Sequence, residues 1–307
     1  MHATDEKTFG GFENSSTHAL DWLQANKDKK FFMFIHGYDA HGQFNLPQNE
    51  KLFVPKDYNG SFTGSPQEEA VLREQQLSQK ISLTPADVSF WNGLYDSKIR
   101  EGDDSFSKFW DEVKKMGLDK NTVVIVLSDH GEEIYEHSGI DHGQSLYDEL
   151  VHVPLVFEIP GFPGGKKINQ QVTSLDVAPT LFALLGLTPD KQYQSQMRGI
   201  NLLPIMQGQE FNGQDVFTET DYRNFTHKRA IQTADGWKYI LTMETGKAEL
   251  YNLKSDPGEK NNLVDKDSKT AFQLDQRLKD HIKAMGDNPY KTWTVGCLPV
   301  YVGECVQ

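Results

Sequence analysis

Hydrophobic and polar positions follow two different patterns along the chain, and the pattern changes near Met206. Before that point, short continuous apolar runs are typical of strands buried on both faces of a parallel sheet. These runs occupy residues 31–36, 122–127 and 153–159. Segments with helical periodicity occupy residues 17–25, 84–116 and 174–187. The alternation of strands and helices predicts an α/β region with a mostly parallel sheet.

After Met206 the apolar runs become shorter, and turn sequences such as Asp235-Gly236 and Thr245-Gly246 separate them. The runs predict antiparallel strands at residues 216–220, 229–233, 238–243 and 249–253. A last amphipathic helix is predicted over residues 268–285, and its expected buried face consists of Phe272, Leu278 and Ile282. We therefore predict an α/β domain over residues 1–206, incomplete at its N-terminus. A C-terminal α+β subdomain with antiparallel strands and a terminal helix would occupy residues 207–307.

Composition narrows the class of protein. Of 307 residues, 37% are hydrophobic and 24% are charged, which fits a soluble globular protein. No apolar run approaches the roughly 18 residues that a membrane-spanning helix needs, and the polar first twenty residues contain no secretory signal. A net charge of −13 argues against nucleic acid as a partner. An anionic substrate would therefore need local positive charge or a metal ion.

Both cysteines, Cys297 and Cys305, lie near the C-terminus. A short-loop disulfide could join them in an oxidising compartment, and Gly296, Pro299 and Gly303 suit a turning loop. They could instead be two separate thiols in a loose tail, but the short spacing favours the disulfide.

Asp129 and His130 directly follow the apolar run that ends at Leu127. Ligands bind at the carboxyl ends of strands in open parallel sheets. A carboxylate and an imidazole at that edge are suitable ligands for a divalent cation, and Gly131 permits a sharp turn or a close approach to a ligand. The alternative is that Asp129 caps a following helix and His130 is a surface residue.

Further histidines lie close to these residues or after another predicted strand. His130, His137 and His142 fall within thirteen residues, which favours a shared role. His36 and His41 follow the first apolar run. A histidine can bind an anionic oxygen or protonate a leaving alkoxide. We favour this role for His41, among small polar residues, and a structural role for His36.

Four motifs resemble those of sulfatases, a branch of the alkaline phosphatase superfamily. FFMFIHGYDAHGQFNLP resembles the family's strand, its His-x-x-Asp-Pro-His sequence and a Pro-containing loop, with Ala40 in place of the usual Pro. LSDHGEEIYEHSGIDHGQSLYDELVHVPLVFEIPG resembles the metal-binding strand, its loop and the next strand. SLDVAPTLFALLGL and AELYNLKSDPGEKNNL resemble an Asp-x-x-Pro-Thr-Leu helix and the C-terminal strand and turn. The motifs occur in the family's order.

The resemblance implies part of an alkaline-phosphatase-like α/β sandwich that hydrolyses an organic sulfate, either a small molecule or a glycan sulfate ester. It also implies a divalent metal, Ca²⁺ in type, and a formylglycine nucleophile made from Cys or Ser. By position, Asp129 and His130 resemble metal ligands. His41 resembles the histidine that contacts the sulfate and assists the leaving group. His142 lies where many members place a sulfate-binding Lys or His, so both histidines are candidate catalytic and substrate-binding residues.

The family's acidic metal-ligand pair and its Cys/Ser-x-Pro/Ala-Ser-Arg segment are not found upstream of residue 16. Cys297-Leu298-Pro299 lacks the Ser and Arg and stands at the other end. We therefore expect this chain to be the C-terminal portion of a sulfatase whose nucleophile lies in a missing segment. Alone it should be inactive and marginally soluble, because one carboxylate and one imidazole hold Ca²⁺ poorly.

Two other functions remain open. Related phosphodiesterases and phosphoglycerol transferases share the Asp-His-Gly motif but use another nucleophile. A non-catalytic half-domain could instead bind an anion or a partner chain. The residues identify neither the substrate nor the oligomeric state, and analogy with bacterial relatives suggests a periplasmic or secreted protein.

Overall fold

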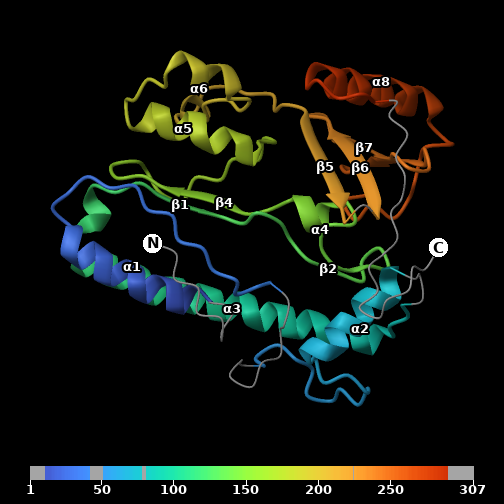
Figure 1. Ribbon diagram of the computed structural model, residues 1–307, viewed down its shortest axis with the longest axis horizontal. Helices are drawn as coiled ribbons and strands as arrows, with labels where there is room; N and C mark the ends of the chain where they lie inside the picture. Colours follow the sequence, from blue (N-terminus) through green and yellow to red (C-terminus); the bar gives the residue numbers. More distant parts are fainter. Residues whose placement is uncertain (1–10, 42–50, 78–80, 224, 290–307) are drawn as a thin grey trace. The chain divides into compact units, whose positions relative to one another are not determined.

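The computed structural model describes residues 11–41, 51–77, 81–223 and 225–289 (Figure 1). Cys297 and Cys305 lie outside these residues, so their disulfide stays a prediction. Internal contacts divide the chain into two compact units. The first comprises residues 1–127, 132–141 and 156–162, and the second comprises residues 128–131, 142–155 and 163–307. The predicted boundary near Met206 stays a prediction.

Two helices form the base of the first unit. α1 (Phe12–Asn26) and α3 (Pro85–Lys115) confirm the helical periodicity of the sequence. Thr84 and Asp87 start α3 with a reciprocal capping box, in which each side chain accepts a hydrogen bond from the other residue's backbone N–H. Leu23 of α1 packs with Phe109 of α3 in a buried cluster, and the short helix η1 (Leu118–Lys120) follows.

A second cluster surrounds the first half of α3. α2 (Pro66–Leu77) contributes Leu72, which packs with Trp91 and Leu94 of α3. Trp91 and Leu94 have no exposed surface. Burial of such large side chains contributes about 1.5–3 kcal/mol each. Val54, Tyr58 and Phe62, in the polar segment before α3, pack against the same cluster, which anchors that segment.

The predicted strand at residues 31–36 is wrong: this run forms no strand with any described segment. Phe31, Met33 and Ile35 pack onto the cluster of α1 and α3. Phe32 and Phe34 are 79% and 76% exposed. The backbone therefore shows one covered face and one open face. A continuous apolar run cannot reveal this difference, because strand pairing depends on a neighbouring chain segment.

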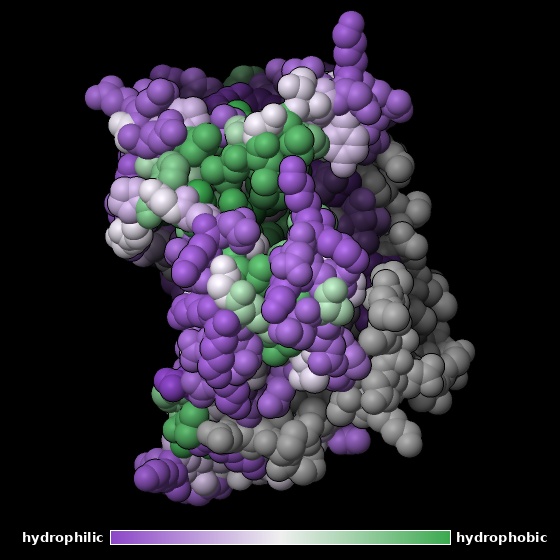
Figure 2. Space-filling view, turned by 90° about the vertical axis from the view of Figure 1, so that its left-hand side faces the viewer, coloured by the Kyte–Doolittle hydropathy of each residue, from purple (hydrophilic) through white to green (hydrophobic). Residues whose placement is uncertain are grey.

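The other two predicted strands are present but shorter. β1 (Val124–Leu127) and β4 (Leu155–Glu158) pair in a two-stranded sheet. Val126 and Val156 are 39% and 56% exposed, so the expectation of burial on both faces is wrong for them. Hydrophobic residues also gather on the face of the molecule in Figure 2. β2 (Glu133–Ile134) and β3 (Ile140–Asp141) form a small antiparallel ribbon.

The second unit contains the helix that was predicted over residues 174–187. It begins as η2 (Ser174–Asp176) and continues as α5 (Val177–Leu184). Asp176 is fully buried and accepts hydrogen bonds from the backbone of Thr173 and Ile200 and from the side chain of Gln214. The short helices α6 (Lys191–Gln196) and α7 (Leu203–Met206) follow.

The antiparallel strands predicted after Met206 are confirmed as one sheet in the order β5-β6-β7-β8. Its strands are β5 (Val216–Tyr222), β6 (Thr226–Gln232), β7 (Trp237–Thr242) and β8 (Ala248–Asn252). α8 (Ser268–Ala284) covers one face through Leu274, Leu278 and Ile282. Phe272, predicted to be buried, is 66% exposed, because it is out of phase with this i, i+4 series.

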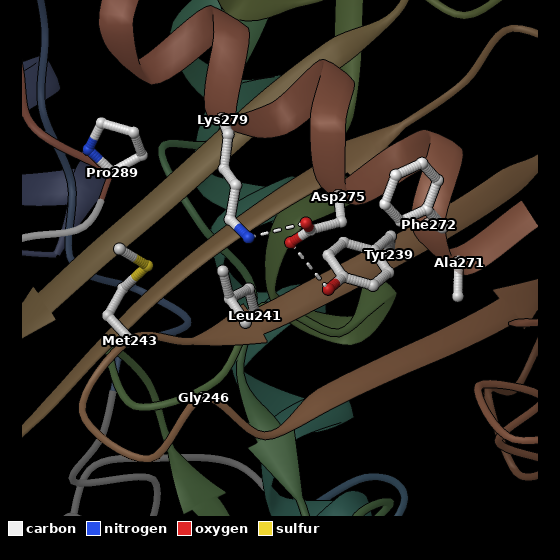
Figure 3. A pocket seen from close by; sticks show the side chains of 9 residues that line it. All are labelled: Tyr239, Leu241, Met243, Gly246, Ala271, Phe272, Asp275, Lys279 and Pro289. Carbon is white, nitrogen blue, oxygen red and sulfur yellow. Dashed lines mark hydrogen bonds and ion pairs between the residues drawn. The ribbon is translucent and has the colours of Figure 1, made fainter.

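A pocket lies between α8 and β7 (Figure 3). At its wall the Tyr239 hydroxyl donates to Asp275, and Lys279 donates to the same carboxylate at 2.7 Å. Burial, followed by the charge of Asp275, raises the pKa of Tyr239 well above its usual value. The pocket contains none of the site residues that the sequence predicts. No helix in the described part of the chain is both long and apolar enough to cross a membrane.

Candidate functional site

Asp129 and His130 lie in the loop after β1, as the sequence predicts. The Asp129 side chain is 73% exposed and the His130 side chain is 33% exposed. His130 Nδ1 lies 2.9 Å from the Gly131 carbonyl oxygen. A carbonyl oxygen only accepts hydrogen bonds, so Nδ1 donates this one, and in the neutral imidazole the lone pair is then on Nε2. This tautomer is the one that a metal ligand requires at Nε2.

The separation of the two donor atoms also suits a shared cation. His130 Nε2 lies 3.7 Å from Asp129 Oδ1. For Zn²⁺, bonds of about 2.0–2.1 Å to nitrogen and about 2.0–2.2 Å to oxygen let one ion touch both atoms at this separation. The Asp129 carboxylate also accepts the His130 backbone N–H at 3.0 Å, which fixes the two residues relative to each other.

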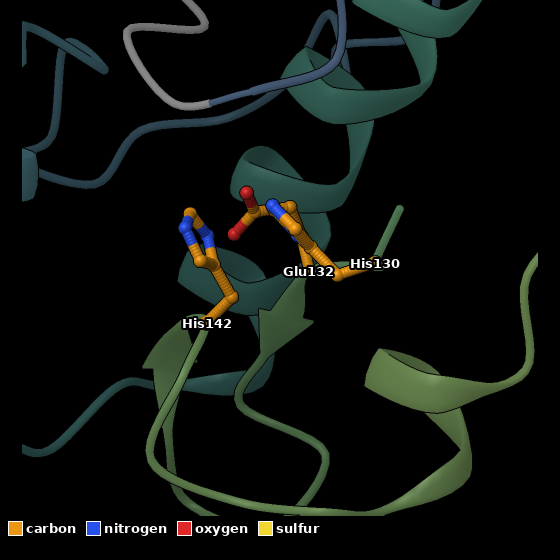
Figure 4. A group of neighbouring side chains, drawn as sticks. All are labelled: His130, Glu132 and His142. Carbon is orange, nitrogen blue, oxygen red and sulfur yellow. The ribbon is translucent and has the colours of Figure 1, made fainter. Parts of the chain in front are cut away.

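The structure brings His142 to His130. Their rings stack with centroids 4.0 Å apart and an interplanar angle of 28°. Glu132, in the same thirteen-residue stretch, completes a group of potential ligand atoms within 4.8 Å of one another (Figure 4). Sequence reasoning missed Glu132, although an acid two residues after a predicted ligand was a usable signal.

The chemistry of these donors fits a divalent cation in general better than Ca²⁺ in particular. The group offers two imidazoles and one carboxylate, whereas Ca²⁺ takes about six to eight oxygen ligands. Imidazole nitrogens with a carboxylate also suit Zn²⁺ and other first-row transition metals. Asp129 adds a second carboxylate to the set. These residues can therefore hold part of a coordination shell.

Gly131 fixes the path of this loop. Its backbone N–H donates to the Leu150 carbonyl of α4 (Asp148–Val151) at 2.9 Å. A Cβ at Gly131 would lie 2.0 Å from the Glu149 carbonyl oxygen, which no side chain tolerates. The close approach that the sequence suggested is thus an approach to the protein's own backbone. The Ser128 hydroxyl donates to the His130 carbonyl at 2.6 Å and tightens the same turn.

The residues on both sides of His142 have positive φ angles. Asp141 has φ 76° and Gly143 has φ 98°. The buried Asp141 carboxylate pairs with Arg73, and the Ile140 N–H donates to the Gln76 side chain at 2.6 Å. A non-glycine residue at positive φ costs energy, so these contacts must over-determine the turn that presents His142.

The C-terminal sheet holds the segment after His142. Thr220 of β5 donates to the Gly143 carbonyl, and the Tyr147 hydroxyl donates to Glu249 of β8 at 2.7 Å. Burial, followed by the charge of Glu249, raises the pKa of Tyr147, so its hydroxyl stays protonated as a donor. The sheet therefore contributes to the site without carrying one of its predicted residues.

A buried charge network anchors α4 to the same sheet. Lys238 of β7 is 1% exposed and binds Glu259 Oε1 at 2.9 Å and Asp148 Oδ1 at 2.8 Å. Glu259 also accepts the Asp148 N–H, which belongs to the first turn of α4. Burial raises the pKa of Glu259, and the Lys238 charge opposes that rise.

His41 and His137 have neighbours of their own within the first unit. His41 belongs to the first unit, in a turn where its ring packs edge-on against Tyr38 with centroids 5.4 Å apart. His137 lies in the loop between β2 and β3, in a separate group with Glu133. His36 is exposed, and its ring centroid lies 4.7 Å from that of Tyr38, so its structural role stays a prediction.

Comparison with known proteins identifies the family to which this chain belongs. The family model described as sulfatase matches residues 13–187, and the model described as N-sulphoglucosamine sulphohydrolase, C-terminal, matches residues 136–287. The chain belongs to the sulfatase family.

Two curated relatives show the extent of the similarity. Delta 4,5-hexuronate-2-O-sulfatase of Bacteroides thetaiotaomicron is 30% identical over 190 residues, which cover 59% of this chain and 38% of that protein. The uncharacterised sulfatase YidJ of Escherichia coli is 25% identical over 302 residues, which cover 94% of this chain and 58% of that protein. This chain thus spans only part of the length of these relatives.

Solved structures confirm the alkaline-phosphatase-like fold. One of them, a protein in complex with its substrate D-glucosamine-2-N,6-O-disulfate, matches with a TM-score of 0.66. The match covers 92% of this chain and 72% of that protein. The sequence identity is 17%, a level that establishes the fold alone.

Proposed function

We propose that this chain serves in the hydrolysis of sulfuric esters, with Asp129 and His130 as ligands of a divalent metal. His41 and His142 are the proposed catalytic and substrate-binding residues. The observation that carries the proposal is the arrangement of His130, whose Nε2 faces Asp129 at 3.7 Å while its ring stacks on His142. Family membership supports the same reaction.

The chain's own residues have distinct tasks in this proposal. The Gly131 carbonyl accepts a hydrogen bond from His130 Nδ1–H, which leaves Nε2 free to face a metal ion. His142 stacks on the His130 ring, and its imidazole can donate a hydrogen bond to a sulfate oxygen. His41 would give a proton to the leaving alkoxide. A bound cation would withdraw charge from the sulfate oxygens.

The finer points of the proposal rest on the family. Ca²⁺ is the expected metal, and it would need more oxygen donors than the group around His130 supplies. Formylglycine is the nucleophile expected from the family. The names of relatives and the substrate of the solved structure favour a glycan sulfate as substrate. A periplasmic or secreted location is part of the same proposal.

Metal binding by the purified chain tests this proposal without requiring turnover. After treatment with a chelator, calorimetric titration with Ca²⁺, Mn²⁺ and Zn²⁺ should reveal one site. Asp129→Asn and His130→Ala should each weaken binding by about 10–100-fold, while His18→Ala, at an exposed position of α1, should not. Equal metal affinity of all four proteins would refute the assignment. A folded chain that binds metal but no sulfate ester would favour the non-catalytic alternative.

A further inference from the structure

The turn between β5 and β6 carries an exposed arginine beside the segment that follows His142. Arg223 stands one residue beyond the end of β5 and has φ 49°. Its guanidinium carbon lies 5.1 Å from the centre of the Tyr222 ring. Among the described residues, no carboxylate lies within 4.0 Å of this guanidinium. Arg223 is therefore a cation that can meet an anion from solution.

Tyr222 lies between this arginine and the segment that follows His142. Its ring packs so closely on Gly143 that a Cβ there would lie 2.5 Å from Tyr222 Cδ2. The Thr220 hydroxyl donates to the Gly143 carbonyl oxygen at 2.5 Å. Gly143 is the residue after His142, so the β5–β6 hairpin is fixed against the segment that presents this histidine.

The carboxylates of the β5–β6 hairpin pair with side chains other than Arg223. Asp221 binds both terminal nitrogens of Arg229, at 2.9 and 3.1 Å, and His227 Nδ1 at 2.9 Å. Glu219 pairs with Arg229 Nε at 3.2 Å. These carboxylates thus neutralise Arg229 rather than Arg223. The chain has a net charge of −13, so an anionic substrate needs a local positive charge. Arg223 supplies one.

We propose that Tyr222 and Arg223 bind the sugar next to the sulfated one, and that this neighbouring sugar carries an anionic group. The inference rests on the proposed function, because His142 marks the position of the sulfate. A guanidinium makes paired hydrogen bonds to the oxygens of a carboxylate or a sulfate. The tyrosine ring adds an apolar surface with a polar edge. The substrate class is therefore an acidic, sulfated oligosaccharide.

The test measures binding by the full chain, in the presence of the metal that it retains, using isothermal titration calorimetry. The probes are sulfated disaccharides that differ only in the neighbouring sugar, which is neutral, carboxylated or sulfated. Arg223→Ala should weaken binding of an anionic disaccharide by about tenfold, the value of one charge-assisted hydrogen bond. Binding of the neutral disaccharide should stay within about twofold, because its contacts do not include that bond.

Two further variants sharpen the comparison. Arg223→Lys should recover only part of the affinity, because an ammonium cannot make the paired hydrogen bonds. Arg100→Ala removes an exposed arginine of α3 that pairs with Asp104, and it should bind every probe as the unmodified chain does. A loss confined to the carboxylated or to the sulfated probe supports the proposal and identifies the anionic group.

Other outcomes overturn the proposal. If Arg223→Ala binds all probes normally while His142→Ala loses them, the inference is wrong and the proposed function stands. If Arg223→Ala weakens binding of the neutral and anionic probes equally, the arginine does not recognise the anionic group of the neighbouring sugar. If the unmodified chain binds no sulfated probe, both the proposed function and the inference fail.

Discussion

His142 stacks its imidazole on that of His130, with ring centroids 4.0 Å apart, although eleven residues separate them in the sequence. This relationship lets the two roles be separated by mutation. His130→Ala should weaken metal binding by about 10–100-fold. His142→Ala should change metal binding far less, but should weaken binding of a sulfated sugar by about tenfold. Titrations of both variants with metal and then with sugar provide the check. If His142→Ala loses metal as severely as His130→Ala does, His142 is a ligand instead.

Gly143 should resist replacement by alanine for two reasons. Its φ of 98° disfavours a side chain, and a Cβ would collide with the Tyr222 ring. Gly143→Ala should lower the free energy of unfolding by at least about 1–3 kcal/mol. Gly246→Ala is the matched control, because Gly246 has φ 69° and a Cβ there would meet no atom within 4 Å, so it should cost only about 1–2 kcal/mol. Urea denaturation measures both, and equal costs would show that the Tyr222 contact is unimportant.

Lys238 should be essential to the stability of the second unit. Lys238→Met leaves the buried Glu259 carboxylate without its cation, so unfolding free energy should fall by about 3–5 kcal/mol. Adding Glu259→Gln removes the uncompensated charge and should restore part of the loss. Urea denaturation of the single and double variants measures this coupling. A single variant as stable as the unmodified chain would contradict the prediction.

Asp221 should make the stability of the folded chain depend on pH in the acidic range. Burial raises its pKa, but the hydrogen bonds from Arg229 and His227 outweigh that effect and lower the pKa below its usual value. The folded state therefore gains stability from this carboxylate above the unfolded pKa of about 3.9, and loses it as pH falls through the lowered native pKa. Asp221→Asn should unfold at a lower temperature than the unmodified chain at pH 7, and this difference should shrink below about pH 4. Thermal unfolding between these pH values tests the prediction, and a constant difference would contradict it.

The sequence by itself determined the elements whose signals are local. Helical periodicity over residues 84–116 predicts α3, and short apolar runs separated by Asp-Gly and Thr-Gly turns predict the β5–β8 sheet. It also predicted Asp129 and His130 together after β1, because two adjacent residues at a strand end share one location. The sulfatase family followed from the order of local motifs.

Only the tertiary structure decided which distant side chains meet. It stacked His142 on His130, added Glu132, and left Phe32 and Phe34 exposed where a buried strand was predicted. It also placed Tyr222 on Gly143 and Lys238 beneath α4, across 79 and 90 residues of sequence. Hydrophobic periodicity records which face of an element is apolar. It does not record which partner covers that face, because pairing is set by long-range packing.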